Sequence, residues 1–334
     1  MIFLKKATIK DVAQRANVSI STVSNTLNGV DVVKPDTRER ILKAAKDLNY
    51  SPNMMGKQLR SQETNTIGVF TDSVAGPYFY TLVESISHAL ASAGYSMNVM
   101  LANDHESLIN ALLGNTCDGA IIFDHMITED DLDKIIKQGL PTVMLDRPVS
   151  GPNLSSIVFD SYQGGLDATR QLIKLGHKRI AFLEGYDNNR DSKLRKAGFM
   201  DALKEANLDT DEPIVLRGFF EEVPSFNSVK QYLRETTKPL VTAFLAGNDL
   251  SAIGTINALK DEGYDVPNDF SVIGFDDIEI AQYFHPALTT VRNPITKQGR
   301  DAVSEVLKMI TGSTEGKKQV LNGKLMIRDS AAML

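Results

Sequence analysis

Residues 19–25 combine small hydrogen-bonding side chains with the spacing of a short helix. Ser, Thr and Asn side chains dominate this stretch, although they have poor helix propensity. Ser19 is a good N-cap, and Val23 and Leu27 recur behind it at helical spacing. We therefore expect a short helix that presents a polar face to a partner. The second helix of a helix-turn-helix uses such a face to reach base edges in the major groove of DNA.

A second set of residues follows the predicted strands of the remaining chain. Asp and Asn side chains donate or accept hydrogen bonds in pairs, Arg offers a fork of donors, and aromatic faces cover the C–H face of a sugar ring. Singly, these residues also have structural interpretations, since Asp146 and Asp160 could cap helices and Phe220 could belong to the core. Arg195 could simply pair on a helix surface. The set comprises residues 76–80, Asp146, Arg147, Asp160, residues 189–195, Phe219, Phe220, Asn248, Asp249, Asp276 and Asp277.

Motifs for catalysis are missing from the sequence. It contains no G-x-S-x-G elbow, no G-x-x-x-x-G-K-[ST] phosphate loop and no G-x-G-x-x-G dinucleotide turn. Its five histidines lack metal-ligand spacing, and His177 in LGHKRIAFLEG is expected to be structural. We therefore expect no catalytic residue, no metal site and no cofactor, although a sugar kinase or dehydrogenase could have a core of this size.

Charge separates the N-terminal part from the rest of the chain. Residues 1–60 hold 11 Lys and Arg against 5 Asp and Glu, whereas the other 274 residues hold 25 against 37. A basic module on an acidic, soluble body is typical of a protein that binds nucleic acid phosphates.

Apolar periodicity in the basic part predicts three helices. The first would begin after a Thr8 cap, the second after Ser19, and the third at Lys34 and Pro35. A small three-helix domain with a purely structural role would show the same pattern. The inward-facing residues of the first and third helices are Ile9, Val12, Ala13, Ala16, Ile41, Ala45 and Leu48.

From Thr66 onward, apolar runs of four to seven residues alternate with amphipathic stretches, which is typical of βαβ units around parallel sheets. So many parallel strands fit two doubly wound sheets better than one, and such sheets bind ligands at the carboxyl ends of their strands. A cleft between two lobes is implied. The runs are IGVFT, YSMNVML, DGAIIF, TVMLD, SSIVFD, RIAFLEG, PIVLRG, TAFLAG and FSVIGFDD, with helices expected at 80–93, 129–138, 162–175, 191–206 and 250–262.

Several long motifs resemble the lactose/galactose-repressor (LacI/GalR) family of bacterial transcriptional regulators. They are IKDVAQRANVSISTVSNTLNG, VKPDTRERILKAAKDLNYSPN and the segment through Leu59, and the resemblance extends over essentially the whole chain. It implies an all-α helix-turn-helix head followed by an α/β core of two doubly wound parallel-sheet lobes like those of periplasmic binding proteins. The implied domains are a head at 1–52, a hinge helix or linker at 53–63, and a core at 64–334. Within the core, one lobe takes about 64–160 and 293–320, and the other takes about 161–290 and 321–334.

The resemblance also assigns DNA contacts to individual positions. Base reading falls on Ile20, Ser21 and Asn25, and the family usually has Arg where this chain has Asn25. Arg pairs with guanine and Asn with adenine, so the preferred base at that position is expected to differ. Phosphate and minor-groove contacts fall on Ser19, Thr22, Ser24, Lys34, Thr37, Asn53, Lys57 and Leu59.

Effector contacts are implied at positions that lie on both lobes. The chain is therefore expected to be a repressor of carbohydrate-utilisation genes, controlled by a sugar and acting as a homodimer on palindromic operator DNA. A nucleobase or a phosphorylated metabolite is the alternative effector. The helix around residues 80–90 and the strand after Ser271 are the candidate dimer surfaces. The matched positions are Tyr78, Phe79, Asp146, Arg195, Phe220, Asn248 and Asp276, to which the residues after the strands add Arg147 and Asn189.

The expected location is the cytoplasm. MIFLKK is too short for a signal peptide, and no apolar run approaches the roughly 18 residues needed to span a bilayer. A single cysteine, Cys117, cannot form an internal disulfide and suits a reducing compartment. A secreted or periplasmic sugar-binding transport protein, which would share the two-lobed core, is therefore disfavoured.

The hinge provides a first test. If Leu59 inserts between base steps in the minor groove, Leu59→Ala should weaken operator binding without changing effector affinity. Gly56→Ala should strengthen operator binding by up to about 1 kcal/mol per chain, because glycine disfavours the helix. Fluorescence anisotropy with an operator selected from random DNA measures both effects. Parent-like binding by both variants would mean that the segment is only a tether.

Overall fold

The computed structural model describes residues 7–51, 63–102, 104–208, 213–236 and 241–334. It divides into two compact units, Met1–Thr64 and Asn65–Leu334, which we describe separately. No helix in the described ranges is both long and apolar enough to cross a membrane.

The first unit contains three helices with sequence-encoded ends. They are α1 (Ile9–Ala16), α2 (Ile20–Leu27) and α3 (Pro35–Asp47). Thr8 and Asp11 form a capping box before α1, and Ser19 caps α2 by accepting from the Thr22 amide. Asn17 adopts a left-handed conformation at the end of α1, which turns the chain toward α2.

A small apolar core holds these three helices together. Val12, Val23 and Ile41 are fully buried, one from each helix, and Ala16 and Ala45 fill the space between them. The predicted inward faces are therefore confirmed, with Ile9 and Leu48 only partly buried at the edge of the core.

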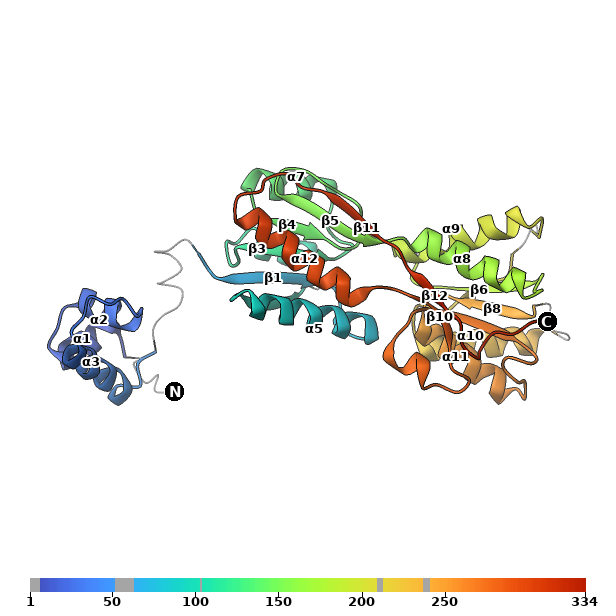
Figure 1. Ribbon diagram of the computed structural model, residues 1–334, viewed down its shortest axis with the longest axis horizontal. Helices are drawn as coiled ribbons and strands as arrows, with labels where there is room; N and C mark the ends of the chain where they lie inside the picture. Colours follow the sequence, from blue (N-terminus) through green and yellow to red (C-terminus); the bar gives the residue numbers. More distant parts are fainter. Residues whose placement is uncertain (1–6, 52–62, 103, 209–212, 237–240) are drawn as a thin grey trace. The chain divides into compact units, whose positions relative to one another are not determined.

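The second unit contains two sheets, as expected, and each has six strands (Figure 1). The first sheet is parallel throughout, with strand order β11-β5-β4-β3-β1-β2. Its strands are β1 (Thr66–Thr71), β2 (Ser96–Leu101), β3 (Gly119–Phe123), β4 (Thr142–Met144), β5 (Leu154–Phe159) and β11 (Lys318–Leu321).

The second sheet has the order β12-β10-β9-β8-β6-β7, and only β12 runs antiparallel to its neighbour. Its strands are β6 (Ile180–Glu184), β7 (Val215–Arg217), β8 (Ala243–Ala246), β9 (Ser271–Asp276), β10 (Thr289–Arg292) and β12 (Lys324–Met326).

Helices cover both faces of each sheet, which explains why the strands are apolar on both sides. On the first sheet, α5 (Pro77–Ser92) and α12 (Ile295–Ile310) pack side by side on one face, while α6 (His105–Leu112) and α7 (Glu129–Gln138) cover the other (Figure 1). On the second, α8 (Ser161–Lys174) and α9 (Arg190–Glu205) cover one face, and α10 (Glu222–Glu235) and α11 (Asp249–Asp261) cover the other.

The chain passes between the two sheets three times. It leaves β5 for α8, returns from β10 to α12, and crosses again between β11 and β12 (Figure 1). Each lobe is consequently built from segments that are distant in sequence.

Two sequence-based expectations need correction. The helix expected at 80–93 begins at Pro77, because a proline at the first helical position has a preset φ and lacks only an amide that would be unpaired there anyway. Tyr78 and Phe79 therefore lie in the first turn of α5 and not in a loop. The strand after Ser271 is wrong as a dimer surface, since β9 is buried along its whole length between β8 and β10.

Two glycines bring α8 and α9 unusually close. A Cβ at Gly198 would lie 2.2 Å from the Tyr162 carbonyl oxygen, and one at Gly165 would lie 2.3 Å from that of Arg195. This close contact fixes the backbone of Arg195, whose side chain enters the site described below.

Gly198→Ala should therefore lower the free energy of unfolding. Overpacking costs about 1–3 kcal/mol, which exceeds the gain of about 1 kcal/mol in helix propensity. Thermal unfolding of the variant measures the loss, with Lys193→Ala on the exposed side of α9 as the control. Equal stability of the Gly198→Ala variant and the parent would show that the two helices can separate freely.

Candidate functional site

The face of α2 carries the polar residues expected to contact DNA. Ile20 is 44% exposed, Ser21 is exposed, and Asn25 is partly exposed one turn further along. The Ser19 hydroxyl lies 2.7 Å from both the Ser21 and Thr22 hydroxyls, so the first turn is organised by its own side chains. Ser24 accepts from the Asn28 side chain at 3.3 Å.

Two further predicted contacts lie at the start of α3. Lys34 is exposed at the N-cap position and Thr37 is partly exposed in the first turn. The remaining predicted contacts, Asn53, Lys57 and Leu59, lie outside the described residues.

Two cavities that share part of their lining lie between the lobes of the second unit. The inner cavity, of about 560 Å³, is lined by Tyr78 and Phe79 of one lobe and by residues such as Arg195 and Asp276 of the other. The outer cavity, of about 500 Å³, is lined by Asp146 and the loop that begins α9. The linings shared by both cavities include Asp72, Phe123, Tyr186, Asn189 and Asp191.

Arg195 is the central residue of the inner cavity. Its side chain is 7% exposed, and its carbon Cζ lies 3.8 Å from the centre of the Phe275 ring. Nη1 donates to the Gly247 carbonyl at 2.5 Å, and Nη2 lies 3.6 Å from Asp276 Oδ1. Nε of Arg195 and Oδ1 of Asp276 are buried without a hydrogen-bond partner among the described residues. Arg195 and Asp276 thus each keep one buried polar atom without a hydrogen bond.

Two of the residues predicted to contact an effector have an unusual, positive-φ backbone conformation. Asp276 has a φ of 109° at the end of β9, and Phe220 has a φ of 60° after β7. Such conformations are costly outside glycine and concentrate at functional sites. The Phe220 ring occupies the space beside Gly185 and Gly247, where an added Cβ would lie 2.3 and 3.0 Å from ring atoms.

Aromatic side chains form the wall contributed by the first lobe. Phe79 contacts Phe123 edge-on at 5.3 Å between ring centres, and Tyr78 packs against both rings. The Tyr78 hydroxyl donates to buried Gln298 at 3.0 Å, which ties the first turn of α5 to α12. Sequence analysis did not identify Gln298, because its role depends on a contact 220 residues away.

Asn248 and Asn189 both line the cavities and both cap helices. The side-chain oxygen of Asn248 accepts from the Ser251 amide, and that of Asn189 accepts from the Ser192 amide. Asn248 also donates to the Phe220 carbonyl at 2.9 Å, so it supports the Phe220 loop. Asn248 and Asn189 are therefore helix caps and cavity-lining residues at the same time.

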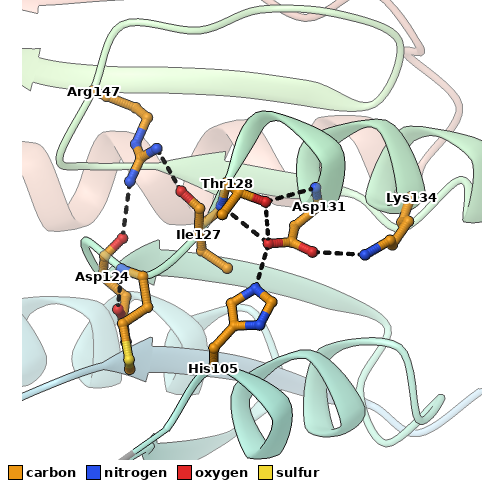
Figure 2. A network of polar contacts seen from close by, with 8 residues as sticks. His105, Asp124, Ile127, Thr128, Asp131, Lys134 and Arg147 are labelled. Atoms are coloured by element: carbon orange, nitrogen blue, oxygen red, sulfur yellow. Dashed lines mark hydrogen bonds and ion pairs between the residues drawn. The ribbon is translucent and has the colours of Figure 1, made fainter.

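Asp146 and Arg147 have different roles at the end of β4. Arg147 donates from Nε to Asp146 Oδ2, and its other nitrogens donate to the carbonyls of Ile127 and Asp124. Figure 2 shows the guanidinium bridging these two carbonyls of the loop before α7. Asp146 Oδ1 is left buried and unpartnered at the outer cavity. Arg147 therefore chiefly positions Asp146 and the loop.

The cavities are acidic, and burial changes the proton affinity of their carboxyl groups. Burial raises the pKa of Asp276 to about 6, although the charge of Arg195 opposes the rise. Burial and the charge of Asp276 raise the pKa of Asp249 well above its usual value. Asp249 is held by the Thr290 hydroxyl and the Ile278 amide beneath the cavity. Burial likewise raises the pKa of Asp146.

Sequence analysis missed several residues that line the cavities. Asp72, Phe123 and Tyr186 each lie at or just after the end of a predicted strand, so the strand-end rule could have found them. Asp191 lines both cavities and accepts from the Ser161 hydroxyl at 2.7 Å. It lay within the segment 189–195 but was not singled out.

Comparison with known proteins identifies the family. Residues 8–53 match the family described as "Bacterial regulatory proteins, lacI family", and residues 169–331 match the "Periplasmic binding protein-like domain". The HTH-type transcriptional repressor PurR of Haemophilus influenzae (strain PittEE) is 36% identical over 335 residues, covering 97% of this chain and 98% of that protein. The chain belongs to the lacI family. It is a DNA-binding transcriptional repressor and not an enzyme.

Solved structures of the lacI family agree with the fold. The lac repressor dimer bound to operator and the anti-inducer ONPF is 30% identical with a TM-score of 0.81, covering 98% of this chain and all of that one. The transcriptional regulator CelR in complex with cellobiose is also 30% identical, with a TM-score of 0.72, covering 97% of this chain and all of that one. Among the described residues of this repressor, no cluster of three or more His, Cys, Asp or Glu could hold a metal ion.

The raised pKa of Asp276 predicts a specific pH dependence. Below about pH 4 the carboxyl is protonated in both the folded and unfolded chains, so its burial costs little. Between about pH 4 and 6 the unfolded chain ionises this carboxyl while the folded chain keeps it protonated, so the folded state loses stability, by about 3 kcal/mol once the pH has risen through about 6. Asp276→Asn removes this loss, so the stability of the variant relative to the parent should rise between pH 4 and 7. Urea unfolding at several pH values tests this, with exposed Asp167→Asn as the control. A pH-independent difference would contradict the assigned burial of charge.

Proposed function

We propose that this repressor controls carbohydrate-utilisation genes, and that a neutral sugar bound between the lobes of its core changes its affinity for operator DNA. The supporting observation is that two residues lining the inner cavity, Arg195 and Asp276, each have a buried polar atom without a hydrogen-bond partner among the described residues, Nε and Oδ1 respectively. A buried polar atom without a partner costs about 1–3 kcal/mol. A sugar hydroxyl both donates and accepts, so adjacent hydroxyls could satisfy both atoms.

The charge of the cavities favours a neutral ligand over a phosphorylated one. Besides Asp276, carboxylates line them at Asp72, Asp146, Asp191 and Glu221. Arg147 and Arg195 are each already paired with a carboxylate, which leaves Arg190 as the one further arginine in the linings to set against these carboxylates. A phosphate group would therefore bring negative charge toward uncompensated negative charge, which is unfavourable in a partly buried site.

Operator reading is proposed for the polar face of α2. Ile20, Ser21 and Asn25 would contact base edges, and Asn25 would select adenine through its amide. Two heads are needed because one helix-turn-helix reads half of a palindrome, so we propose a homodimer. Phosphate and minor-groove contacts are proposed for Ser19, Thr22, Ser24, Lys34, Thr37, Asn53, Lys57 and Leu59.

The proposed coupling requires that the sugar contact both lobes. Tyr78 and Phe79 are supplied by the first lobe, and Arg195, Phe220 and Asp276 by the second. A ligand that prefers one relative arrangement of the lobes shifts the population toward it. The effect on operator affinity is then reciprocal, and is typically worth 1–3 kcal/mol.

Thermal shift with neutral sugars, sugar phosphates and nucleobases tests the proposal. A ligand at 100 times its dissociation constant adds about 2.7 kcal/mol of stability, and we expect only neutral sugars to do so. Arg195→Ala and Asp276→Ala should each weaken the sugar by about tenfold or more in calorimetry, because each removes a charge-assisted hydrogen bond.

Operator binding supplies the control for these variants. Both should bind a selected operator fragment like the parent but no longer respond to the sugar, whereas Asp167→Ala should keep both properties. Stabilisation by a nucleobase or a sugar phosphate alone would overturn the sugar assignment. Unchanged sugar affinity in both cavity variants would place the ligand elsewhere.

A further inference from the structure

A buried glutamine amide connects the wall of the inner cavity to the interior of the first lobe. Gln298 lies near the start of α12, is 2% exposed and does not line either cavity. Its oxygen Oε1 accepts from the Tyr78 hydroxyl at 3.0 Å, and its nitrogen Nε2 donates to the Ile157 carbonyl at 2.9 Å. A longer contact of Nε2 reaches the Leu145 carbonyl at 3.5 Å. Both ends of the amide are therefore hydrogen-bonded.

The chemistry of these partners fixes the orientation of the amide. Backbone carbonyls only accept hydrogen bonds, so the nitrogen of Gln298 has to face Ile157 and its oxygen has to face Tyr78. The Tyr78 hydroxyl must then donate. It keeps its proton because burial raises the pKa of Tyr78 well above the usual value. The contact between the two side chains thus has one donor and one acceptor, with fixed roles.

Close packing of α5 and α12 keeps these two side chains together. Gly299 follows Gln298 in the chain, and a Cβ added there would collide with the Ser85 hydroxyl and lie 3.1 Å from the Ser85 Cβ. A larger residue would have to displace Ser85 or separate the helices. Tyr78, in the first turn of α5, is consequently held against the start of α12.

Gln298 also adjoins the segments by which the chain crosses between the lobes. Ile157 belongs to β5, which leads into the first crossing, and α12 directly follows the second (Figure 1). The third crossing packs on the other two, because a Cβ added at Gly323 would lie 2.7 Å from the Phe159 ring and 2.9 Å from Val291. We call Phe159, Val291 and Gly323 the crossing cluster.

We propose that Gln298 is a positioning residue that links the inner cavity to the crossing cluster, so that a displacement of Tyr78 changes the arrangement of the lobes. This inference rests on the proposed coupling between lobe arrangement and operator affinity, and it adds the side chain that carries the coupling. Hydrogen bonds of a buried amide largely replace bonds to water, so their net gain in stability is small. What Gln298 supplies is the relative position of Tyr78 and β5.

Operator binding by the ligand-free repressor tests this link. Gln298→Met and Tyr78→Phe should each change the dissociation constant for a selected operator by about threefold or more, in the same direction, since one hydrogen bond is worth roughly a factor of two to ten. The double variant should match Gln298→Met within about twofold, because the bond that the second change removes is already lost. Fluorescence anisotropy measures all three. Effects that simply multiply would overturn the link.

Gln138→Met is the matched control. Gln138 is an exposed glutamine of the same lobe, and its amide also donates to a backbone carbonyl, that of Leu113 at 3.1 Å. It belongs to α7, on the face of the sheet opposite α12. We therefore expect its replacement to leave operator affinity unchanged.

Gln298→Glu adds a conservative variant with a pH readout. When protonated, the introduced carboxyl can accept from Tyr78 and donate to the Ile157 carbonyl, but when ionised it cannot donate. Burial favours the protonated form, so operator affinity should approach that of the parent as the pH falls from about 8 to about 5.5. Gln298→Met, measured at the same pH values, should show no such recovery. A Gln298→Glu variant that matches Gln298→Met at every pH would contradict the positioning role.

Hydrogen exchange distinguishes this inference from the proposed function. The Asp160 amide, at the first crossing, donates to the Leu321 carbonyl at 2.9 Å. In mass spectrometry of the ligand-free protein, peptides containing this amide should exchange faster in Gln298→Met and Tyr78→Phe, relative to peptides from the central strand β3, but not in Gln138→Met. Faster exchange with unchanged operator affinity would overturn the proposed coupling of the lobes to the operator. Unchanged exchange in both variants would overturn the role of Gln298 itself.

Discussion

The buried guanidinium of Arg195 is the interaction on which the inner cavity between the lobes depends. It lies over the Phe275 ring, donates to the Gly247 carbonyl and pairs loosely with Asp276. A charge this deeply buried is tolerated only where aromatic, carbonyl and carboxylate groups replace its water. The ends of two strands of the second sheet, β8 and β9, must therefore converge on one helix position. The close contact of α8 and α9 at Gly165 and Gly198 holds that position in place.

The rest of the cleft follows from sheet topology. Both sheets direct the carboxyl ends of their parallel strands toward the space between the lobes, and the loops after β1, β3, β4, β6, β7, β8 and β9 line the cavities there. The three chain crossings leave each lobe covalently tied to the other at several points. A ligand that satisfies unpaired donors and acceptors on both sides thus acts on the arrangement of the lobes as well as on local contacts. Signal reception and the DNA-reading helix remain in separate units, each with its own apolar core.

Many of the residues that line the cavities were identified by the rule that ligands bind at the carboxyl ends of parallel strands. This rule needs only the order of strands and loops along the chain. Tyr78, Phe79, Asp146, Arg195, Phe220, Asn248 and Asp276 line the cavities together with Arg147 and Asn189. The same rule would have added Asp72, Phe123 and Tyr186, which were overlooked. Gln298 could not be predicted from the sequence, because no neighbouring residue indicates that its side-chain oxygen accepts a hydrogen bond from Tyr78, which is 220 residues away in the chain. The exposure of β9 was misjudged for a related reason, because an edge strand and a central strand have similar apolar patterns.

The sequence by itself determined the family, the three-helix head, the two sheets and many residues of the cavity lining, because capping residues, apolar periodicity and long motifs are properties of neighbouring residues. Only the tertiary structure decided which polar atoms remain unpaired. The guanidinium of Arg147 donates hydrogen bonds to the loop carbonyls of Asp124 and Ile127. Arg190, in contrast, has a buried nitrogen without a hydrogen-bond partner among the described residues. Identical side chains with similar positions after strands have different roles here, since hydrogen-bond satisfaction depends on groups that the fold brings together from distant parts of the chain.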